Sequence, residues 1–539
     1  MKIRFEPNNI TLDAKVGDTV LQTAINASIT IEADCFGEGT CGKCKVKILA
    51  GDLGEPDEVE KSFLTEDEIK NGIRLACRVR VTDNLVIKIP ERSVDQRKKD
   101  LVWLPENFVH DKKEASKYGV AFDIGTTTVV GMLWDLEEGK LINSAARTNP
   151  QTTFGADVIS RILFTKQEDG NLELMQEKIL EALNNIILEF NEKEGISPKD
   201  ICYATAVGNT TMSHLLLAID PIGLAMVPFE PGFTGHVEIP ASKLGLNINH
   251  NAKVIVLPNI AGHVGSDIVA VMVASGIKKL EGANLAIDIG TNGEIVLAYK
   301  GEILACSTAA GPAFEGASIR QGMRATKGAI ERVKISEDRV QLSVIENATP
   351  IGICGSGLIE CVSEILKLGL ISENGRMLDK EEAKQKGYSE EIYERLRKGE
   401  NGNEFVLYWG KDSIDVTLTQ KDVREVQLAK AAIAAGINIL MNELEIEPSD
   451  LNNIFLAGAF GNYIDKDSAI TIGLLPNVPK DKVVSIGNAA GAGVSMALLS
   501  ESTLKHAFSL AETSKHIELA SNPNFQKIYL ENMYFKKEN

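Results

Sequence analysis

The segment Ala121-Phe122-Asp123-Ile124-Gly125-Thr126 decides the fold, because it occurs a second time as Ala286-Ile287-Asp288-Ile289-Gly290-Thr291. Each copy ends an apolar run, turns at Gly-Thr and continues into a second run, Val129–Trp134 in the first copy and Glu294–Ala298 in the second. Apolar runs of this length that end in glycine-rich turns indicate buried strands. A repeat at so long a spacing predicts two duplicated α/β domains rather than a solenoid.

Both copies carry the residues of a phosphate-binding turn. Asp123 and Asp288 stand at the predicted strand ends, where a carboxylate can hold Mg²⁺ directly or through water. The exposed backbone N–H groups of the turn that follows can hold phosphate oxygens. A single Asp-x-Gly-Thr motif is weak evidence, because ordinary strand–turn–strand hairpins contain it often. Two copies in a duplicated frame favour a phosphate site to which both domains contribute.

Two later segments rich in small residues strengthen this interpretation. Ile454–Gly461 is predicted to be a buried strand that runs into a turn where a flat ligand can approach the backbone. Gly487–Gly493 opens a helix of small residues, and its expected packing partner is Gly262–Gly276. With the repeated turns, these segments resemble the five-part signature of the acetate and sugar kinase, heat-shock chaperone and actin superfamily (ASKHA). The resemblance covers residues 118 to about 500 and implies that ATP lies in a cleft between two RNase H-like domains.

The resemblance assigns roles by motif position. Asp123 and Asp288 are the expected catalytic carboxylates, and Mg²⁺ is the expected metal. The expected nucleotide-binding residues are Gly125, Thr126 and Thr127 in the first turn, Gly290, Thr291, Asn292 and Gly293 in the second, and Gly458, Ala459, Phe460 and Gly461 in the adenosine loop.

Two helix entries leave alternatives open. The turn Gly355-Ser356-Gly357 precedes a helix predicted to begin near Leu358, and it either presents amides to phosphate or serves as a structural helix entry. A longer helix is predicted over Thr419–Leu440, with Thr419 as its N-cap. Its polar residues Gln420, Asp422 and Lys430 are expected on an exposed face, with nucleotide contact as the alternative.

Four of the eight cysteines predict an iron–sulfur site near the start of the chain. Cys35, Cys41, Cys44 and Cys77 have the spacing C-x5-C-x2-C-x32-C, with glycines between the first three. Thiolates are soft ligands that suit iron–sulfur clusters or zinc, but structural zinc usually takes two short-spaced pairs. Three cysteines in one glycine-rich loop and a fourth on a distant strand favour [2Fe–2S]. The pattern resembles the β-grasp ferredoxin domain in its adrenodoxin-like spacing, over roughly residues 1–92. The other four cysteines are expected in the core.

The rest of the chain indicates a cytoplasmic multidomain protein. A charge-rich stretch over residues 93–117 is interpreted as a linker, so that a ferredoxin-type domain (1–92) precedes a middle RNase H-like domain (118–281) and a C-terminal ASKHA domain (282–539). The net charge of −18 argues against nucleic acid as a partner. No uncharged apolar run is long enough to span a membrane, and the first residues lack the apolar core of a signal peptide.

This domain order resembles that of the reductive activators of corrinoid proteins. The resemblance implies ATP-dependent reduction of a partner's inactive Co(II) corrinoid to Co(I) in anaerobic methyl transfer, with one electron passing from the [2Fe–2S] cluster. It also implies a low-potential electron donor and suggests a homodimer. The corrinoid is expected on the partner, because this sequence contains no cobalamin-binding motif such as D-x-H-x-x-G.

Three other functions fit parts of the sequence. A small-molecule kinase with a fused redox domain would need a general base for its acceptor hydroxyl, and no residue is uniquely identified for that role. An activator of a radical dehydratase or reductase usually holds a cluster between subunits, and the remaining cysteines offer no obvious pair. A redox-regulated nucleotide switch without catalytic activity is the fourth alternative.

Overall fold

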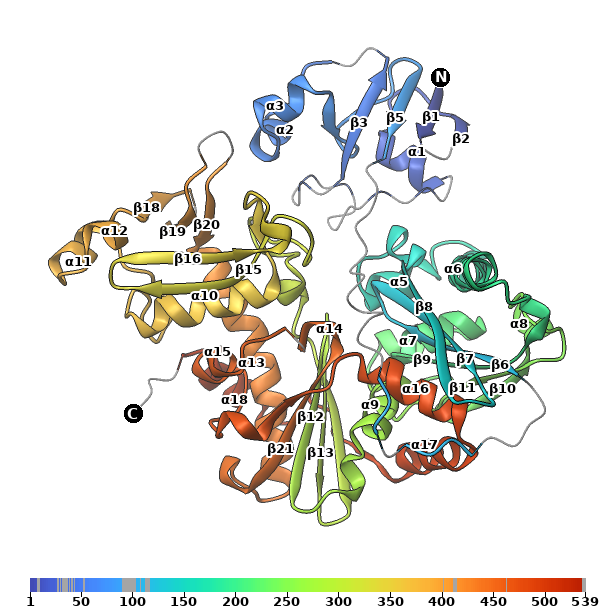
Figure 1. Ribbon diagram of the computed structural model, residues 1–539. Coiled ribbons are helices and arrows are strands. Elements are labelled where there is room, and N and C mark those ends of the chain that lie inside the picture. Colours follow the sequence, from blue (N-terminus) through green and yellow to red (C-terminus); the bar gives the residue numbers. More distant parts are fainter. Residues whose placement is uncertain are drawn as a thin grey trace.

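The computed structural model of the chain contains an N-terminal unit and two larger units that pack against each other (Figure 1). The described residues are 1–6, 10–26, 29, 31, 37, 39, 42, 44–51, 54–89, 103–106, 108–111, 117–400, 402–410, 414–461 and 463–535. In this part of the chain, no helix combines the length and the apolar character that crossing a bilayer requires.

The N-terminal unit is a five-stranded mixed sheet in the order β2-β1-β5-β3-β4. Alternate side chains of β1, such as Ile3 and Phe5, are buried in the core of this unit, while their neighbours are exposed, as a half-buried strand requires. The elements are β1 (Lys2–Glu6), β2 (Ile10–Asp13), α1 (Val20–Asn26), β3 (Lys45–Ala50), α2 (Glu58–Phe63), α3 (Glu66–Lys70), β4 (Ile73–Leu75) and β5 (Leu85–Lys88).

The middle unit is a six-stranded sheet in the order β10-β11-β9-β6-β7-β8. The first motif copy lies at the end of β6, which pairs antiparallel with β7 and parallel with β9. The elements are β6 (Tyr118–Ile124), β7 (Thr128–Asp135), β8 (Lys140–Thr148), α5 (Val158–Phe164), α6 (Asn171–Glu194), β9 (Ile201–Gly208), α7 (Thr210–Leu217), β10 (Val237–Pro240), α8 (Ala241–Leu244), β11 (Lys253–Val256) and α9 (Ser266–Ser275).

The C-terminal unit has the order β22-β21-β12-β13-β14-β23, in which β22-β21-β12-β13-β14 repeats the arrangement of β11-β9-β6-β7-β8. The second motif copy ends β12, which again pairs antiparallel with the next strand and parallel with a later one. The predicted duplication is therefore confirmed. The elements are β12 (Ala283–Ile289), β13 (Gly293–Tyr299), β14 (Glu302–Thr308), α13 (Gln420–Glu443), β21 (Leu451–Ala457), α14 (Gly458–Gly461), α15 (Lys466–Thr471), β22 (Val483–Ser485), α16 (Ala489–Leu499), α17 (Glu501–Thr513), β23 (Lys515–His516) and α18 (Phe525–Asn532).

An insertion between β14 and α13 forms two small three-stranded sheets, in the orders β16-β15-β17 and β18-β19-β20. Its elements are β15 (Ala329–Ser336), β16 (Arg339–Val344), β17 (Gly352–Ile353), α10 (Gly355–Lys367), α11 (Lys380–Gln385), α12 (Glu390–Tyr393), β18 (Leu396–Gly399), β19 (Gly402–Tyr408) and β20 (Val416–Thr419). Short 3-10 turns, among them η1 (Pro150–Thr153), η3 (Ile222–Ala225) and η5 (Pro312–Glu315), connect the larger elements.

Helices α9 and α16 form a shared core between the two large sheets. In Figure 1 the red helix α16 lies among the cyan and green strands of the middle unit, although it follows β22 in the chain. Trp134 of β7 donates its indole N–H to Ser495 Oγ on α16 at 3.1 Å, and Thr205 of β9 donates to the Val494 carbonyl at 3.0 Å. The expected pairing of the two small-residue helices is confirmed, because α9 and α16 share one hydrophobic cluster.

Part of the predicted linker is packed on the C-terminal unit. Trp103 donates its indole N–H to the Ile486 carbonyl at 2.8 Å. Asp111 accepts hydrogen bonds from the Glu501 N–H at 2.7 Å and from Ser502 Oγ at 2.5 Å. Residues 90–102, 107 and 112–116 lie outside the described residues. The described part of this stretch therefore contacts the C-terminal unit and, at His110, also the middle unit, where its Nε2 lies 3.0 Å from the Glu137 carbonyl oxygen.

Candidate functional site

A cavity of about 240 Å³ opens where the two motif copies meet, between the large units. It lies at the carboxyl ends of β6 and β12, because each copy turns there from its first strand into its second. The predicted site residues that line it are Asp123, Gly125, Thr126, Thr127, Asp288, Gly290, Thr291, Asn292, Gly355, Ser356 and Gly458. The structure thus brings residues of both turns, of the α10 entry and of the loop after β21 to one place.

The first turn is held in place by Asn149 and Asn209. The Asn149 Nδ2 donates to the Gly125 carbonyl at 2.9 Å, and the Asn149 backbone N–H donates to the Thr127 carbonyl at 2.8 Å. Asn209, the N-cap of α7, donates from Nδ2 to Thr126 Oγ1 at 3.0 Å. These contacts fix the turn while its cavity face remains available to a ligand.

The second turn approaches the loop after β21 so closely that only glycine fits there. Gly458 has a φ of +83°, and a Cβ added to it would lie 2.7 Å from Asp288 Oδ1. Thr291 donates to Glu315 Oε1 at 3.1 Å, and the Gly290 N–H donates to the Asn292 carbonyl at 2.9 Å. Gly458 therefore lets the backbone of the predicted adenosine loop lie directly beside the carboxylate.

Five carboxylates line the cavity: Asp123, Asp267, Asp288, Glu294 and Glu315. Burial, together with the charges of Asp288 and Asp123, raises the pKa of Asp267 to about 7. Burial and the charges of Asp267 and Asp288 raise the pKa of Glu294 well above its usual range. This crowding of negative charge in a buried wall is the electrostatic setting that a divalent cation would relieve.

The donor set fits Mg²⁺ held jointly with phosphate. Among the described residues, no group of three or more histidine, cysteine, aspartate or glutamate side chains is arranged to hold a metal ion by itself. Mg²⁺ is usually bound by one or two carboxylates together with water and phosphate oxygens. The carboxylates of Asp123 and Asp288 are the candidates for that contact.

The side-chain amide of Asn488 carries a hydrogen-bond donor that no described residue of the protein accepts. This side chain is 1% exposed, and its Oδ1 accepts the Gly491 N–H at 2.9 Å as the N-cap of α16. The residue lines the cavity, and its Nδ2 has no hydrogen-bond partner among the described residues. A buried amide without a partner is costly, so a bound ligand oxygen is a fitting acceptor for it.

Several predicted residues lie away from the cavity. Gly293 begins β13, where a Cβ would lie 2.8 Å from Thr308 Oγ1, and Gly357 packs against the Ile330 carbonyl. Gly461 accepts a hydrogen bond from Ser485 at the end of α14. Ala459 and Phe460 belong to α14, but their side chains are outside the described residues. Helix α10 begins at Gly355 rather than near Leu358, which brings Gly355 and Ser356 into the cavity wall.

Sequence reasoning missed several lining residues, including Asn209, Asp267, Glu294, Glu315, Arg324 and Asn488. Asp267 and Asn488 do carry a signal, because each stands at the start of a small-residue helix that the sequence predicts. Glu294 has an apolar counterpart in the first copy, Val129, so comparison of the repeats would single it out as a charged residue in a strand.

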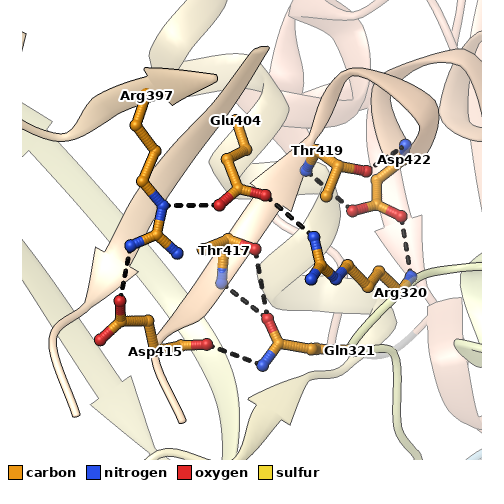
Figure 2. Close-up of polar contacts among 8 residues, drawn as sticks. All are labelled: Arg320, Gln321, Arg397, Glu404, Asp415, Thr417, Thr419 and Asp422. Atoms are coloured by element: carbon orange, nitrogen blue, oxygen red, sulfur yellow. Dashed lines mark hydrogen bonds and ion pairs between the residues drawn. The ribbon is translucent and has the colours of Figure 1, made fainter. Parts of the chain in front are cut away.

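A polar network holds Arg320 and Gln321 in place (Figure 2). These two residues shortly precede Met323, Arg324 and Ala325, which line the cavity. The Arg320 N–H donates to Asp422 Oδ1 at 2.8 Å, and the Arg320 guanidinium donates to Glu404 at 3.0 Å. Figure 2 shows Glu404 between two arginines, since Arg397 Nε also donates to it at 2.6 Å.

The same network joins the small β18–β19–β20 sheet to Arg320 and Gln321. Arg397 reaches Asp415 at 2.7 Å, and Gln321 donates to the Asp415 carbonyl and accepts the Thr417 N–H, both at 2.8 Å. The network therefore ties a wall of the cavity to the insertion.

The expected exposed face of the helix over Thr419–Leu440 is wrong for two of its three residues. Asp422 is fully buried and forms a capping box with Thr419, and Lys430 is 1% exposed and donates to the Tyr534 carbonyl at 2.6 Å. Gln420 is partly buried and bonds to Gly375 and Met377. None of the three lines the cavity. Their partners come from distant segments, which local periodicity does not reveal.

The described part of the cysteine cluster fits a metal–sulfur site. Cys44 and Cys77 are buried and form no disulfide, and the Cys77 N–H donates to Cys44 Sγ at 3.5 Å. Gly42 has a φ of +65°, and a Cβ there would lie 2.5 Å from the Phe63 ring. Cys35 and Cys41 lie outside the described residues. Two thiols brought together beside a left-handed glycine match the loop that the spacing predicts.

Of the remaining cysteines, Cys306, Cys354 and Cys361 are buried as expected, whereas Cys202 is only partly buried. Burial raises the pKa of the Cys306 and Cys361 thiols. Cys354 is the N-cap of α10 and also lines the cavity.

Two duplicated halves with a carboxylate-lined cavity between them, preceded by a β-grasp unit with buried cysteines, define an ASKHA-type ATPase fused to a [2Fe–2S] ferredoxin-type domain. Family models match all three parts. Residues 282–539 match the C-terminal ASKHA domain of RACo, residues 118–280 match the RACo middle region, and residues 3–82 match the 2Fe-2S iron-sulfur cluster binding domain.

The chain belongs to the family of reductive activators of corrinoid proteins. It is 40% identical over 442 residues to the corrinoid activation enzyme RamQ of Eubacterium limosum, covering 80% of this chain and 72% of that protein. It is 27% identical over 449 residues to the [Co(II) methylated amine-specific corrinoid protein] reductase of Methanosarcina barkeri, covering 77% and 76%. The solved structure of a reductive activator for corrinoid, iron-sulfur protein matches 99% of this chain and 98% of its own, with a TM-score of 0.71 and 30% identity.

Proposed function

We propose that this protein is an ATP-dependent reductive activator of a corrinoid protein, which returns an inactive Co(II) corrinoid to Co(I). The observation that carries the proposal is the likeness over nearly the whole chain to a reductive activator, with both its ferredoxin-type unit and its two-lobed ATPase present. The relatives RamQ and the Co(II) corrinoid protein reductase support the substrate class.

The nucleotide would lie in the cavity between the two large units. Asp123 and Asp288 line it from the two turns, as the carboxylates that would hold Mg²⁺ with the phosphates. Backbone N–H groups of Thr126 and Thr127 and of Thr291 and Asn292 would bind phosphate oxygens, since those of Gly125 and Gly290 donate within their own turns. Gly355 and Ser356 would add the N–H groups of the α10 N-terminus. Both large units line the cavity, so a ligand bound there would favour their closed arrangement.

Cys35, Cys41, Cys44 and Cys77 would hold the [2Fe–2S] cluster. When bound, the cluster supplies the single electron that the corrinoid requires. The chain's own contribution is to keep Cys44 and Cys77 buried among apolar side chains and to turn the loop through glycines, which limits access of water to the sulfurs.

The combination of an ATPase with an electron carrier has a thermodynamic reason. An uphill gap of roughly 300 mV for one electron corresponds to about 7 kcal/mol, or about five powers of ten. A nucleotide that binds one conformation of a complex preferentially can supply coupling of that size only through differential affinity for the two states. ATP binding and closure of the two lobes would provide such a difference.

The proposed working units are a ferredoxin-type domain (1–92), a linker (93–117), a middle domain (118–281) and a C-terminal ASKHA domain (282–539). A low-potential donor would reduce the cluster, and the partner would bring the corrinoid. The acidic chain with unpaired thiols at Cys306 and Cys361 fits a cytoplasmic location, and a homodimer would match the family resemblance.

The decisive experiment mixes anaerobically reduced protein with a purified Co(II) corrinoid protein and follows visible absorbance with and without Mg-ATP. Formation of Co(I) only with ATP would support the coupled reductase. Co(I) formation in both cases would leave a ferredoxin-type reductant whose ATPase serves another purpose. No Co(I) in either case, across several corrinoid partners, would overturn the proposal and favour a kinase or a nucleotide switch.

Two sets of variants test the ATP site and the iron–sulfur cluster separately. Asp123→Ala and Asp288→Ala should abolish the dependence on ATP while the visible spectrum of the cluster stays intact. Cys41→Ala should remove the cluster spectrum while ATP still binds. Full reductive activity in Cys41→Ala would show that the electron takes another route.

A further inference from the structure

Arg161 of α5 is a fully buried arginine directly behind the first phosphate turn. Its guanidinium donates to the Thr126 carbonyl at 2.6 Å and to the Gly155 carbonyl at 2.8 Å, and it contacts Met212 Sδ at 3.4 Å. Thr126 lines the cavity, so one peptide unit separates the guanidinium from the face on which phosphate would lie. The sequence pattern alone gives this arginine no role.

The charge of Arg161 has no carboxylate partner within ion-pair distance in the part of the chain that the structure describes. Its polar partners are two carbonyl oxygens and a thioether sulfur. Burial lowers the pKa of Arg161 to about 9, although the charge of Asp157 acts in the opposite direction. A buried charge without a counter-charge is strongly unfavourable for a folded chain. A ligand that brings negative charge to this place would supply the missing counter-charge.

The surroundings are built to accommodate this arginine. A Cβ added to Gly155 would lie 2.7 Å from Arg161 Cγ, so a larger residue at 155 would displace the side chain. Asn149 and Asn209 already fix the turn through neutral amides. Hydrogen bonding alone therefore does not account for a full positive charge in the same position.

We propose that Arg161 is a positioning residue for the nucleotide, which orients the Thr126 peptide and acts through it as the fixed positive charge opposite the terminal phosphates. The proposal rests on the proposed function and deepens it by naming how the ATP site recognises phosphate charge. In a water-poor interior, a charge acts on a neighbouring ion far more strongly than it would in solvent. The contribution of Arg161 thus increases with the number of phosphates on the ligand and is absent for adenosine.

The test compares the dissociation constants of Mg-ATP and adenosine by calorimetry for the full-length protein and three variants. Arg161→Gln keeps a hydrogen-bond donor and loses the charge, Arg161→Lys keeps the charge, and Arg147→Gln removes a partly exposed arginine of the same unit. We expect Arg161→Gln to weaken Mg-ATP binding by about tenfold or more and adenosine binding by less than about twofold. Arg161→Lys at pH 7 and Arg147→Gln should stay within about threefold of the wild type for both ligands.

A second readout covers the case in which Arg161→Gln does not fold. A buried lysine loses its proton far more readily than a buried arginine. Mg-ATP affinity of Arg161→Lys should therefore fall several-fold between pH 7 and pH 8.5 relative to the wild type, whose Arg161 stays largely charged below its pKa of about 9. Adenosine affinity should show no such difference.

Failure of the proposed function and failure of the Arg161 role give different results. A wild-type protein that binds no Mg-ATP would overturn the proposed function itself. If the wild type binds Mg-ATP, the role of Arg161 would be overturned by equal losses for Mg-ATP and adenosine in Arg161→Gln, which indicate a structural effect alone. Unchanged Mg-ATP affinity in Arg161→Gln, or a flat pH dependence in Arg161→Lys, would also overturn it.

Discussion

Gly493 of α16 crosses α9 at Ala270 so closely that a Cβ added to Gly493 would lie 1.9 Å from the Ala270 carbonyl oxygen. No residue with a Cβ fits at this contact without a backbone shift. The crossing lies inside the core that both large sheets share. Any separation of α9 from α16 therefore disturbs both halves of the ATPase at once.

Gly493→Ala should destabilise the two large units by about 3 kcal/mol or more, because the added methyl group meets backbone rather than a flexible side chain. Denaturant unfolding followed by Trp fluorescence measures this change. Gly235→Ala is the matched control, since nothing lies within 4 Å of a Cβ at that exposed position. Equal stability of the two variants would show that the helices can move apart without loss.

We expect Asp267 to make the stability of the nucleotide-free protein dependent on pH. Its pKa rises from an ordinary 3.8 to about 7, mainly through burial and the charge of Asp288. The stabilising contribution of the protonated form is complete below about pH 4 and is lost as the pH rises towards 7. Asp267→Asn removes this loss, and a pKa difference of one corresponds to roughly 1.4 kcal/mol in the free energy of unfolding.

The measurement is the melting temperature from pH 5 to pH 8 in a chelating buffer without nucleotide. Asp267→Asn should melt higher than the wild type at pH 8, and the difference should shrink towards pH 5. A constant difference across this range would mean that Asp267 is ionised throughout and that its neighbours carry the proton instead.

Glu404 is expected to support nucleotide binding from a distance. It is buried between Arg320 and Arg397, and Arg320 begins the segment that reaches the cavity at Met323. Glu404→Gln leaves two arginines without their shared carboxylate, so we expect about 2 kcal/mol lower stability and several-fold weaker Mg-ATP binding.

Calorimetric titration of Mg-ATP into Glu404→Gln tests this role. Glu394→Gln is the matched control, because Glu394 pairs with Lys380 at the surface of the same insertion. Wild-type affinity in a destabilised Glu404→Gln would show that the network maintains only the insertion.

Among the described residues of the ferredoxin-type unit, one ion pair is buried and the others are partly or fully exposed. Arg74 donates to both carboxylate oxygens of Glu60, at 2.9 and 2.5 Å, and the Leu75 N–H donates to the same side chain. Glu60→Gln should lower the stability of this unit by about 3 kcal/mol, since it leaves a buried guanidinium without its counter-charge.

Thermal loss of the visible cluster spectrum monitors this unit separately from the ATPase. Glu58→Gln removes an exposed pair with Lys61 and should change the midpoint by very little. Similar midpoints for Glu60→Gln and Glu58→Gln would contradict the assignment of stability to the buried pair.

Side-chain pairing reduces the free negative charge of the acidic segment from Glu55 to Glu68. Five of its carboxylates are paired with basic side chains. The pairs are Asp57 with Arg78, Glu58 with Lys61, Glu60 with Arg74, Glu66 with Lys70 and Glu68 with Lys45. The segment therefore presents less free negative charge than its composition indicates.

The duplicated sheets can be predicted because the sequence features that determine them are local. The runs around Asp123 and Asp288 are apolar, end in glycine and repeat, so strand, turn and pairing partner follow from pattern alone. The cavity residues that the pattern identifies are mostly those on these turns. Asp267 reaches the same cavity from α9, whose placement depends on how the two halves dock. Glu294 follows the second turn on β13, and only comparison with Val129 of the first copy singles it out.

Buried polar residues are the other place where pattern and structure differ. Asp422 and Lys430 are expected on an exposed helix face because isolated charges are usually solvated. Asp422 is instead satisfied by the Arg320 N–H, and Lys430 by the Tyr534 carbonyl. Each partner is about 100 residues away in the chain. The helix N-cap at Thr419, a local feature, is confirmed.

The packing of α16 against the middle sheet sets the order in which the chain can fold as it is made. Trp134 and its partner Ser495 are 361 residues apart in the chain. At about 5–20 residues per second, a ribosome needs on the order of 20–70 s to travel between them. For that interval the nascent middle sheet has one apolar face without its permanent cover. A chaperone that shields such a face during synthesis would therefore raise the yield of this protein, and a chain that stops before α16 would expose the same face permanently.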